Sequence, residues 1–234
     1  MALPLYLAMT TQEMDARDTL PPQLGWMACH FDPAGSGLRD IPDALPPGAM
    51  LILNDRFPCR GHDPQKVSRQ LTDAVKRLNC EGVLLDFQRK PDAHFKTVAD
   101  ALFKALPCPV AAPPGFIKDL ACAVFLPPCP LHVPLAEYLL PRRGQAIWLD
   151  VTMGQQTITV TRNGTTYAPP TPADMQDGRF DDILLCRYVM EISEEEVRFT
   201  LFDTPETLKI KLQEAAKLGV TRAVGLYQEL GGKL

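Results

Sequence analysis

The chain has 234 residues, a formal net charge of −4 at pH 7 and hydrophobic side chains at 46% of its positions. These values are typical of a globular protein and exclude a disordered or fibrous chain. The acidic balance, without a cluster of Lys and Arg, argues against a nucleic-acid partner, and no apolar run reaches the roughly 18 to 20 residues that cross a membrane.

The N-terminal segment and the cysteines bear on the cellular compartment. The apolar residues near the N-terminus follow no Lys or Arg, whereas a secretory signal peptide needs a positively charged start. The seven cysteines are odd in number and irregular in spacing, which fits reduced thiols better than a disulfide framework. We therefore expect a cytoplasmic protein with no membrane partner, and the sequence does not fix its oligomeric state.

Short apolar runs alternate with amphipathic stretches along the chain, a pattern typical of βαβ units with parallel strands. Eight such runs predict a closed (β/α)8 TIM-type barrel rather than an open sheet. The expected strands are Leu5–Met9, Leu24–Phe31, Met50–Asn54, Gly82–Phe87, Pro109–Ala112, Cys122–Leu126, Ala146–Val151 and Ala223–Tyr227.

Three helices are predicted from their first residues. Asp63, Asp92 and Thr204 are side chains that cap helix N-termini, and proline follows the first and the last of them. Apolar residues then recur at helical spacing after each cap. Gly219 is expected to end the third helix.

Residues 152 to 202 depart from the strand–helix repeat. Asn163-Gly164 lies between two β-like runs and indicates a type I′ hairpin. A proline-rich segment at 168–173 is followed by two further β-like runs, Ile183–Ile192 and Val197–Asp203. We interpret this stretch as a small antiparallel excursion between barrel strands 7 and 8, inserted into a single domain that spans residues 1–234.

Candidate binding residues follow from the barrel prediction, because TIM-barrel sites form at the C-terminal ends of the strands. A polar side chain at such an end can equally be explained by contact with solvent, so we assign none of them a catalytic role. The candidates are His30, Asp32, Asn54, Asp55, Asp86, Gln88, Asp150 and Tyr227.

The fourth predicted strand carries the most specific pattern. It reads EGVLLDFQ from residue 81, and alternation places Asp86 and Gln88 on the same face of the strand. This resembles the fourth strand of glycoside hydrolase family 18, the chitinase-like barrels, whose motif is D-G-x-D-x-D-x-E. Glu81 and Leu84 replace the first two acids, Asp86 keeps the third, and Gln88 replaces the catalytic Glu.

A second stretch is similar to the C-terminal part of the same family. In the segment 199–230, a strand with a terminal acid leads to a helix that contains Lys, and a strand with Gly and a terminal aromatic residue follows. The matching positions are Asp203, Lys209 or Lys211, Gly225 and Tyr227, with Tyr in place of the family's Trp. The family's Met-x-Tyr-Asp segment is not recognisable at 123–126.

The resemblance implies a site without a proton donor. In the family, the Glu protonates the leaving oxygen while the substrate's acetamido group acts as nucleophile, and an amide such as Gln88 cannot hold and donate that proton. Loss of general acid catalysis costs about 10² to 10⁴ in rate. We therefore expect no family-18-type hydrolysis, with carbohydrate or another polyol as the candidate ligand of Asp86 and Gln88. The alternative is that barrel hydrogen bonds satisfy both side chains.

Two other patterns could indicate a metal or a cofactor, but neither has the spacing or the residues that such a site needs. We therefore predict no metal and no cofactor. Cys59 with His62, and Cys129 with His132, form two Cys-x-x-His pairs, but they follow strands on nearly opposite sides of the barrel, too far apart for ordinary zinc spacing. The glycine-rich segment 34–37 before an expected helix at Leu38 lacks the Lys of a phosphate-binding loop, so we interpret it as a turn.

Three functions remain open on the sequence. The first is a glycosidase-like barrel that binds a glycan or polyol without cleaving it. The second is an active hydrolase that uses His30, Asp32, Asp55 and Asp150, because His and Asp together can perform acid–base chemistry near neutral pH. The third is a structural or interaction protein on a decayed barrel.

Overall fold

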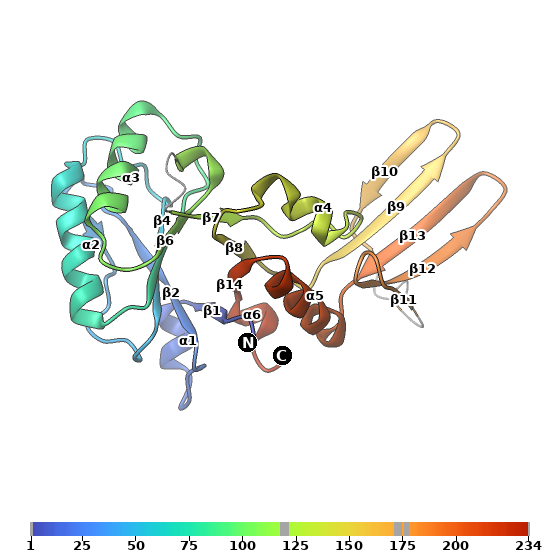
Figure 1. Ribbon diagram of the computed structural model, residues 1–234, viewed down its shortest axis with the longest axis horizontal. Coiled ribbons are helices and arrows are strands. Elements are labelled where there is room, and N and C mark those ends of the chain that lie inside the picture. The colour runs from blue at the N-terminus through green and yellow to red at the C-terminus, as the bar shows by residue number, and fades with distance from the viewer. Residues whose placement is uncertain (1, 118–121, 171–174, 176–177, 234) are drawn as a thin grey trace.

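The computed structural model describes residues 2–117, 122–170, 175 and 178–233, and it contains a closed barrel of eight parallel strands. Strand β1 pairs in parallel with both β2 and β14, which closes the ring and confirms the predicted (β/α)8 fold (Figure 1). The barrel strands are β1 (Leu5–Met9), β2 (Leu24–Phe31), β4 (Met50–Asn54), β5 (Gly82–Asp86), β6 (Val110–Ala112), β7 (Ala123–Leu126), β8 (Ile147–Asp150) and β14 (Val220–Leu226).

Apolar side chains pack together inside the barrel. Successive side chains of a strand point to opposite faces, so every second residue contributes to this inner core. The inner cluster comprises Tyr6, Ala8, Met50, Ile52, Leu84, Ala111, Ala123, Phe125, Trp148 and Val224.

Helices cover two sectors of the barrel. Helices α2 (Pro64–Leu78) and α3 (Ala93–Ala105) lie side by side over β2, β4 and β5, where they bury the largest cluster of the protein (Figure 1). Helices α4 (Leu135–Leu139) and α5 (Pro205–Lys217) pack over β7, β8 and β14. The predicted caps are confirmed, because Asp63, Asp92 and Thr204 each accept a hydrogen bond from the first turn of their helix.

The remaining elements outside the barrel and the arm are short. They are α1 (Thr11–Asp15), β3 (Leu38–Arg39), η1 (Pro114–Phe116), η2 (Leu140–Arg142) and α6 (Tyr227–Leu230).

The expected helix at Leu38 is wrong. Leu38 begins β3, which pairs antiparallel with the end of β2 through Phe31. Gly35 and Gly37 have positive φ angles of 76° and 133°, which L-residues rarely adopt, and they turn the chain back on itself. The reversal brings the chain alongside β2 before a helix can start.

The excursion between β8 and β14 is a second, five-stranded antiparallel sheet. Its strand order is β10-β9-β13-β12-β11, and it extends away from the barrel as an arm (Figure 1). Its strands are β9 (Gln155–Thr161), β10 (Gly164–Ala168), β11 (Arg179–Asp181), β12 (Cys186–Ile192) and β13 (Glu196–Phe202). Part of the proline-rich segment, at 171–173, lies outside the described residues.

The hairpin is present, but its predicted turn type is wrong. Thr161 pairs with Gly164, so the two turn residues are Arg162 and Asn163, one position earlier than expected. Asn163 is not among the residues with positive φ, as a type I′ turn would require, whereas Gly164 has φ of 136°. The Thr161 hydroxyl accepts from the Asn163 amide at 3.1 Å and donates to the Gly164 carbonyl at 3.2 Å. These two hydrogen bonds hold the turn one residue earlier than expected.

The predicted strand at Ile183–Ile192 starts too soon. β12 begins at Cys186, because the Asp181 side chain accepts hydrogen bonds from the amides of Ile183 and Leu184 and Leu185 takes a positive φ of 56°. These residues therefore form the turn between β11 and β12.

Among the described residues, no helix combines the length and the apolar character that a membrane crossing demands.

Candidate functional site: the barrel mouth

Three barrel strands each place a polar side chain at the C-terminal mouth. Asn54, Asp86 and Asp150 end β4, β5 and β8, two residues beyond interior side chains of the same strands. Alternation therefore directs them toward the barrel axis. Asn54 and Asp86 are also direct partners in the register of β4 and β5.

Gln88 joins this group through Asp86. Its amide nitrogen donates a hydrogen bond to the Asp86 carboxylate at 2.5 Å, while the Gln88 side chain is exposed. Burial raises the pKa of Asp86, the Gln88 hydrogen bond lowers it, and the charge of Asp55 raises it. The contact leaves the Gln88 side-chain oxygen free to accept from a ligand hydroxyl.

Asp150 is the most strongly perturbed carboxyl group of the mouth. Burial is the main reason that its pKa rises to about 7; the negative charge of Asp86 is the next, with a smaller contribution from Glu229. A hydrogen bond from the Val151 backbone acts in the opposite direction. Burial and the nearby charge of Asp86 thus both favour the neutral form of the Asp150 carboxyl group.

Asp55 holds the loop that presents Gln88. It is 4% exposed, and its two oxygens accept from the Gln88 amide at 3.0 Å and the Arg89 amide at 2.7 Å. Asn54 donates to the Met27 carbonyl at 2.8 Å. With Arg56, Asp86, Gln88 and Arg89, these two residues line an open cavity of about 370 Å³.

His30 and Asp32 are engaged within their own segment. His30 Nδ1 lies 2.9 Å from the Ala28 carbonyl and 3.4 Å from Asp40, and its ring packs on Phe57. Asp32, 1% exposed, accepts from the Ala34 amide and the Ser36 hydroxyl.

Arg39 lies 2.9 Å from the same Asp32 carboxylate, which is therefore fully engaged. Its contacts hold the glycine-rich turn before β3. The structure does not bring His30 or Asp32 together with Asp150 through any of these contacts.

Tyr227 is placed apart from the other candidates. It begins α6 and packs against a cluster that contains Met9 and Leu24, and the Arg17 guanidinium lies 4.4 Å from its ring centre. β14 ends at Leu226, which lies on the same inward face as the interior residue Val224 and is 46% exposed. Leu226, and not Tyr227, therefore occupies the mouth position of this strand.

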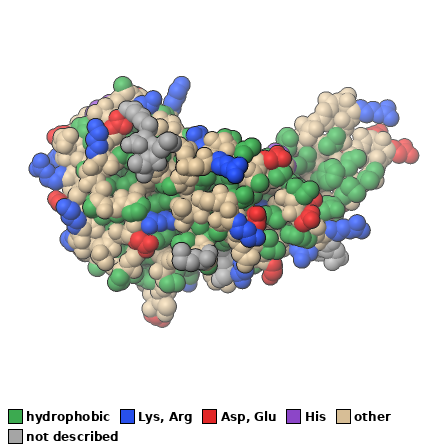
Figure 2. Space-filling model, in the orientation of Figure 1, with side chains coloured by type: hydrophobic (Ala, Val, Ile, Leu, Met, Phe, Trp, Pro, Cys, Tyr) green, Lys and Arg blue, Asp and Glu red, His purple; other side chains and the backbone are tan. Residues whose placement is uncertain are grey.

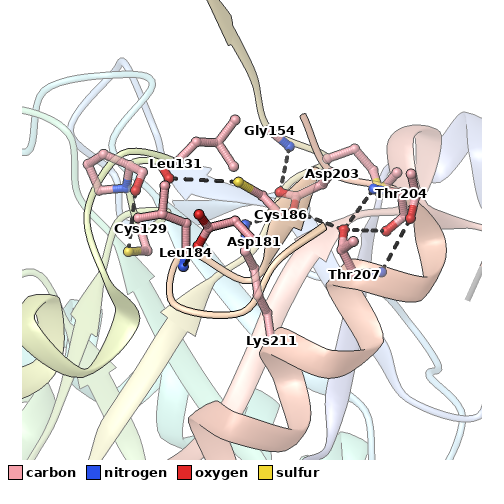
Figure 3. Close-up of polar contacts among 12 residues, drawn as sticks. Cys129, Leu131, Gly154, Asp181, Leu184, Cys186, Asp203, Thr204, Thr207 and Lys211 are labelled. Atoms are coloured by element: carbon pink, nitrogen blue, oxygen red, sulfur yellow. Dashed lines mark hydrogen bonds and ion pairs between the residues drawn. The ribbon is translucent and has the colours of Figure 1, made fainter. Parts of the chain in front are cut away.

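The segment that resembles the family's C-terminal part forms an ion pair at the base of the arm (Figure 3). Lys211, not Lys209, contacts Asp203, at 2.7 Å, and the Asp203 side chain is 3% exposed. Asp203 also accepts from the Gly154 amide at 3.2 Å and from Thr207 at 3.2 Å. The pair therefore ties β13 to α5 and to the start of the arm.

The two Cys-x-x-His pairs have separate surroundings. His62 is 2% exposed and meets the edge of Phe31, whereas His132 contacts Gln156 at 3.0 Å. In the described part of the chain, no three His, Cys, Asp or Glu side chains gather as metal ligands would. All seven cysteines lie in that part, and none of them forms a disulfide.

Arg89 is a residue of this region that the sequence analysis missed. Its guanidinium donates to the carbonyls of Asp55 at 2.9 Å and Arg56 at 3.1 Å, so it bridges the loops after β4 and β5. The only signal in the sequence was the pair of basic residues directly after Gln88.

Comparisons with known proteins agree with this architecture. No family model and no curated protein sequence matches the chain. The spore cortex-lytic enzyme SleL of Bacillus cereus superposes with a TM-score of 0.58 at 9% identity, over 98% of this chain and 71% of that one.

Two chitinases give similar results. The family GH18 chitinase of Cycas revoluta, in complex with allosamidin, matches with a TM-score of 0.57 at 12% identity, over 96% of this chain and 94% of that one. A chitinase of Chromobacterium violaceum matches with a TM-score of 0.53 at 12% identity, over 100% and 96%. At such low identity the likeness concerns the fold: the chain has a TIM barrel similar to those of glycoside hydrolase family 18.

Proposed function

We propose that the protein binds a carbohydrate at the barrel mouth without family-18-type hydrolysis. The observation that supports this most directly is the contact between the Gln88 amide and Asp86 at the end of β5. In the barrels that this chain resembles, the corresponding side chain is an acid that donates a proton. An amide at this position can hydrogen-bond a sugar but cannot supply the proton.

Carbohydrate as the ligand is supported by the solved structures of similar fold. The Cycas revoluta chitinase has been solved in complex with (GlcNAc)3, and a double variant with one glutamate changed to glutamine has been solved in complex with (GlcNAc)4. The mouth of this chain presents carboxylate, amide and guanidinium groups in its cavity of about 370 Å³. Such groups fix the orientation of a polar ligand.

Isothermal titration with (GlcNAc)4 tests the binding. We expect binding to the wild type and a loss of about tenfold or more for Asp86→Asn, because a charge-assisted hydrogen bond would become a neutral one. Asp73→Asn is the matched control, since Asp73 is exposed on α2. Absence of binding across neutral and charged oligosaccharides would contradict the proposal.

A fluorogenic chitotrioside tests the missing hydrolysis. We expect no turnover by the wild type above buffer. If wild-type turnover is observed and Asp150→Asn abolishes it, the second hypothesis, an active hydrolase with Asp150 as its acid, replaces the first. The pKa of Asp150, raised to about 7, makes it the appropriate candidate for that role.

One observation favours an interaction role in addition. Pairing in the arm sheet places Val160, Tyr167, Met190 and Ile192 on one face, and all four are 40% or more exposed. Figure 2 shows the hydrophobic side chains gathered over this arm. Large apolar side chains that share an exposed face commonly mark a protein interface.

We propose a second copy of the chain as the partner of this face. The turn between β9 and β10 and the turn between β12 and β13 lie at the far end of the arm (Figure 1). The first contains Arg162 and the second contains Glu194 and Glu195, and all three residues are exposed. Two copies that pack face to face about a twofold axis along the strands would set Arg162 of each over the two glutamates of the other.

Sedimentation equilibrium tests this interface. We expect a concentration-dependent dimer that Met190→Glu with Ile192→Lys converts to a monomer. The matched control changes Val189, which the same pairing places on the opposite face, to Lys. A wild-type protein that remains monomeric at about 100 micromolar would contradict the proposal.

A further inference from the structure

A second cavity lies beside the mouth, between the loop from β4 to α2 and the loop from β5 to α3. Its volume is about 500 Å³, and its charged lining consists of Arg60, Arg89, Lys90 and Asp92. Three cations thus face one carboxylate in a chain whose net charge is −4. We refer to this cavity as the cationic cleft.

The cations of the cleft have no acidic partner among the described residues, where none of the ion pairs includes them. Asp92 caps α3, because one of its oxygens accepts from the Phe95 amide at 2.7 Å. The positive charge of the cleft is therefore only partly neutralised from within.

Arg89 is held in place before any ligand arrives. Two of its nitrogens donate to the carbonyls of Asp55 and Arg56, at 2.9 Å and 3.1 Å. Carbonyl groups fix the orientation of a guanidinium without cancelling its charge. A fixed cation loses less entropy when it binds an anion than a mobile one does.

Arg89 also lines the mouth cavity that contains Asp86 and Gln88, so the two cavities share one wall. A ligand that contacts Gln88 with a sugar hydroxyl can thus reach Arg89 with its next substituent. The charged lining of the mouth cavity is balanced, with the carboxyls Asp55 and Asp86 and the cations Arg56 and Arg89, whereas the cleft has three cations and one carboxylate. An anionic group is consequently favoured in the cleft over the mouth.

We propose that the cationic cleft binds the carboxylate of an acidic oligosaccharide whose neutral ring lies at Asp86 and Gln88. The proposal rests on the carbohydrate-binding function above and specifies its ligand class. Arg presents paired donors that match a planar carboxylate, and Arg60 and Lys90 add charge from both loops. A fully neutral glycan would leave these cations unused.

Isothermal titration with three probes tests the proposal. They are a hyaluronan tetrasaccharide, the same tetrasaccharide with its carboxyl groups reduced to alcohols, and neutral (GlcNAc)4. We expect the acidic probe to bind about tenfold more tightly than its reduced form, the value of roughly one charge-assisted hydrogen bond. We also expect the difference to shrink as salt is raised.

The variant Arg60→Gln with Lys90→Gln should remove the preference for the acidic probe while leaving (GlcNAc)4 binding within twofold. Arg143→Gln with Lys104→Gln is the matched control, because both residues lie toward the opposite end of the barrel, before β8 and at the end of α3. Circular dichroism verifies that each variant is folded.

The outcomes separate this inference from the function on which it rests. Equal binding of all three probes, unchanged in the cleft variant, overturns the cationic cleft as a carboxylate site and leaves carbohydrate binding intact. Citrate is titrated separately as a small carboxylate; if it binds and no oligosaccharide does, the acidic oligosaccharide is overturned as the ligand. Absence of binding by every probe overturns both.

Discussion

Single side chains at the mouth of the barrel set how the protein responds to pH. Asp86 and Asp150 are both partly buried carboxyls; the charge of Asp86 raises the pKa of Asp150, and the charge of Asp55 raises the pKa of Asp86. Because the folded-state pKa of Asp150 lies above that of the unfolded chain, the folded state binds its proton more tightly. The stabilisation that this proton provides is complete below about pH 4 and is lost as the pH rises through about 7.

Asp150→Asn should therefore change the pH dependence of stability. The wild type is expected to lose about 2 kcal/mol of unfolding free energy between pH 5 and pH 8 from this group, and the variant should not. Urea denaturation at both pH values measures the difference. Asp73→Asn, on the exposed face of α2, should follow the wild type; an Asp150→Asn profile parallel to the wild type would contradict the assignment.

The buried pair of Asp203 and Lys211 makes the second prediction at this scale. Asp203→Ala should destabilise the protein by about 3 to 5 kcal/mol, because it leaves the Lys211 ammonium buried without its counter-charge. The double variant with Lys211→Met should recover much of that loss. Thermal unfolding of the single and double variants gives the coupling, and equal losses in both would show that the pair does not act as a unit.

At the scale of elements, the short-range patterns were the most predictable. Asp63, Asp92 and Thr204 were identifiable because capping chemistry is local to the first turn of a helix. The turn at Arg162-Asn163 was not, because the Thr161 hydroxyl competes with the preference of Asn-Gly. Likewise, nothing local indicated that Leu38 would pair with β2, since that pairing depends on a chain reversal.

The candidate site was predictable only in part for the same reason. Alternation along β5 predicted that Asp86 and Gln88 share a face, and the two side chains are in contact. That Asp32 is used to hold its own turn, or that Arg89 bridges two loops, depends on contacts across sequence distance. No pattern within one segment contains that information.

Gly164 provides a test of the observed turn. Its φ of 136° is unfavourable for any residue with a Cβ, although no atom lies within 4 Å of the position that a Cβ would occupy. Gly164→Ala should therefore cost about 1 kcal/mol or more through backbone strain alone. Denaturant titration measures this loss of unfolding free energy. Gly154→Ala is not a suitable control, because a Cβ at that position would lie 3.0 Å from the Leu131 side chain. An unchanged midpoint would contradict the strained geometry.

At the scale of the whole molecule, the two ends of the arm meet where it leaves the barrel. The Asp203 amide donates to the Gly154 carbonyl at 2.8 Å, and the Gly154 amide donates back to the Asp203 side chain at 3.2 Å. The first and last residues of the excursion are thus adjacent. An insertion with neighbouring ends can be removed without separating the strands that flank it.

Replacement of residues 155–202 by a two-residue turn should leave a folded barrel. We expect cooperative thermal unfolding and retained far-ultraviolet circular dichroism, at a lower midpoint because Leu131 would lose its contacts with Cys186 and Leu201. The chemical-shift dispersion of the proton NMR spectrum shows whether the shortened chain is folded. A shortened chain without cooperative unfolding would show that the arm and the barrel form one folding unit.

The pairing of β1 with β14 has a consequence during synthesis on the ribosome. The last barrel strand, β14, follows the other barrel strands and the arm in the chain, so the first strand waits for all of them before its second neighbour exists. Until then the nascent polypeptide exposes two unpaired strand edges, which are sites for aberrant association between chains. Ring closure is accordingly the last step in assembly of the barrel, and the time between emergence of β1 and emergence of β14 is the interval in which this protein most needs a chaperone.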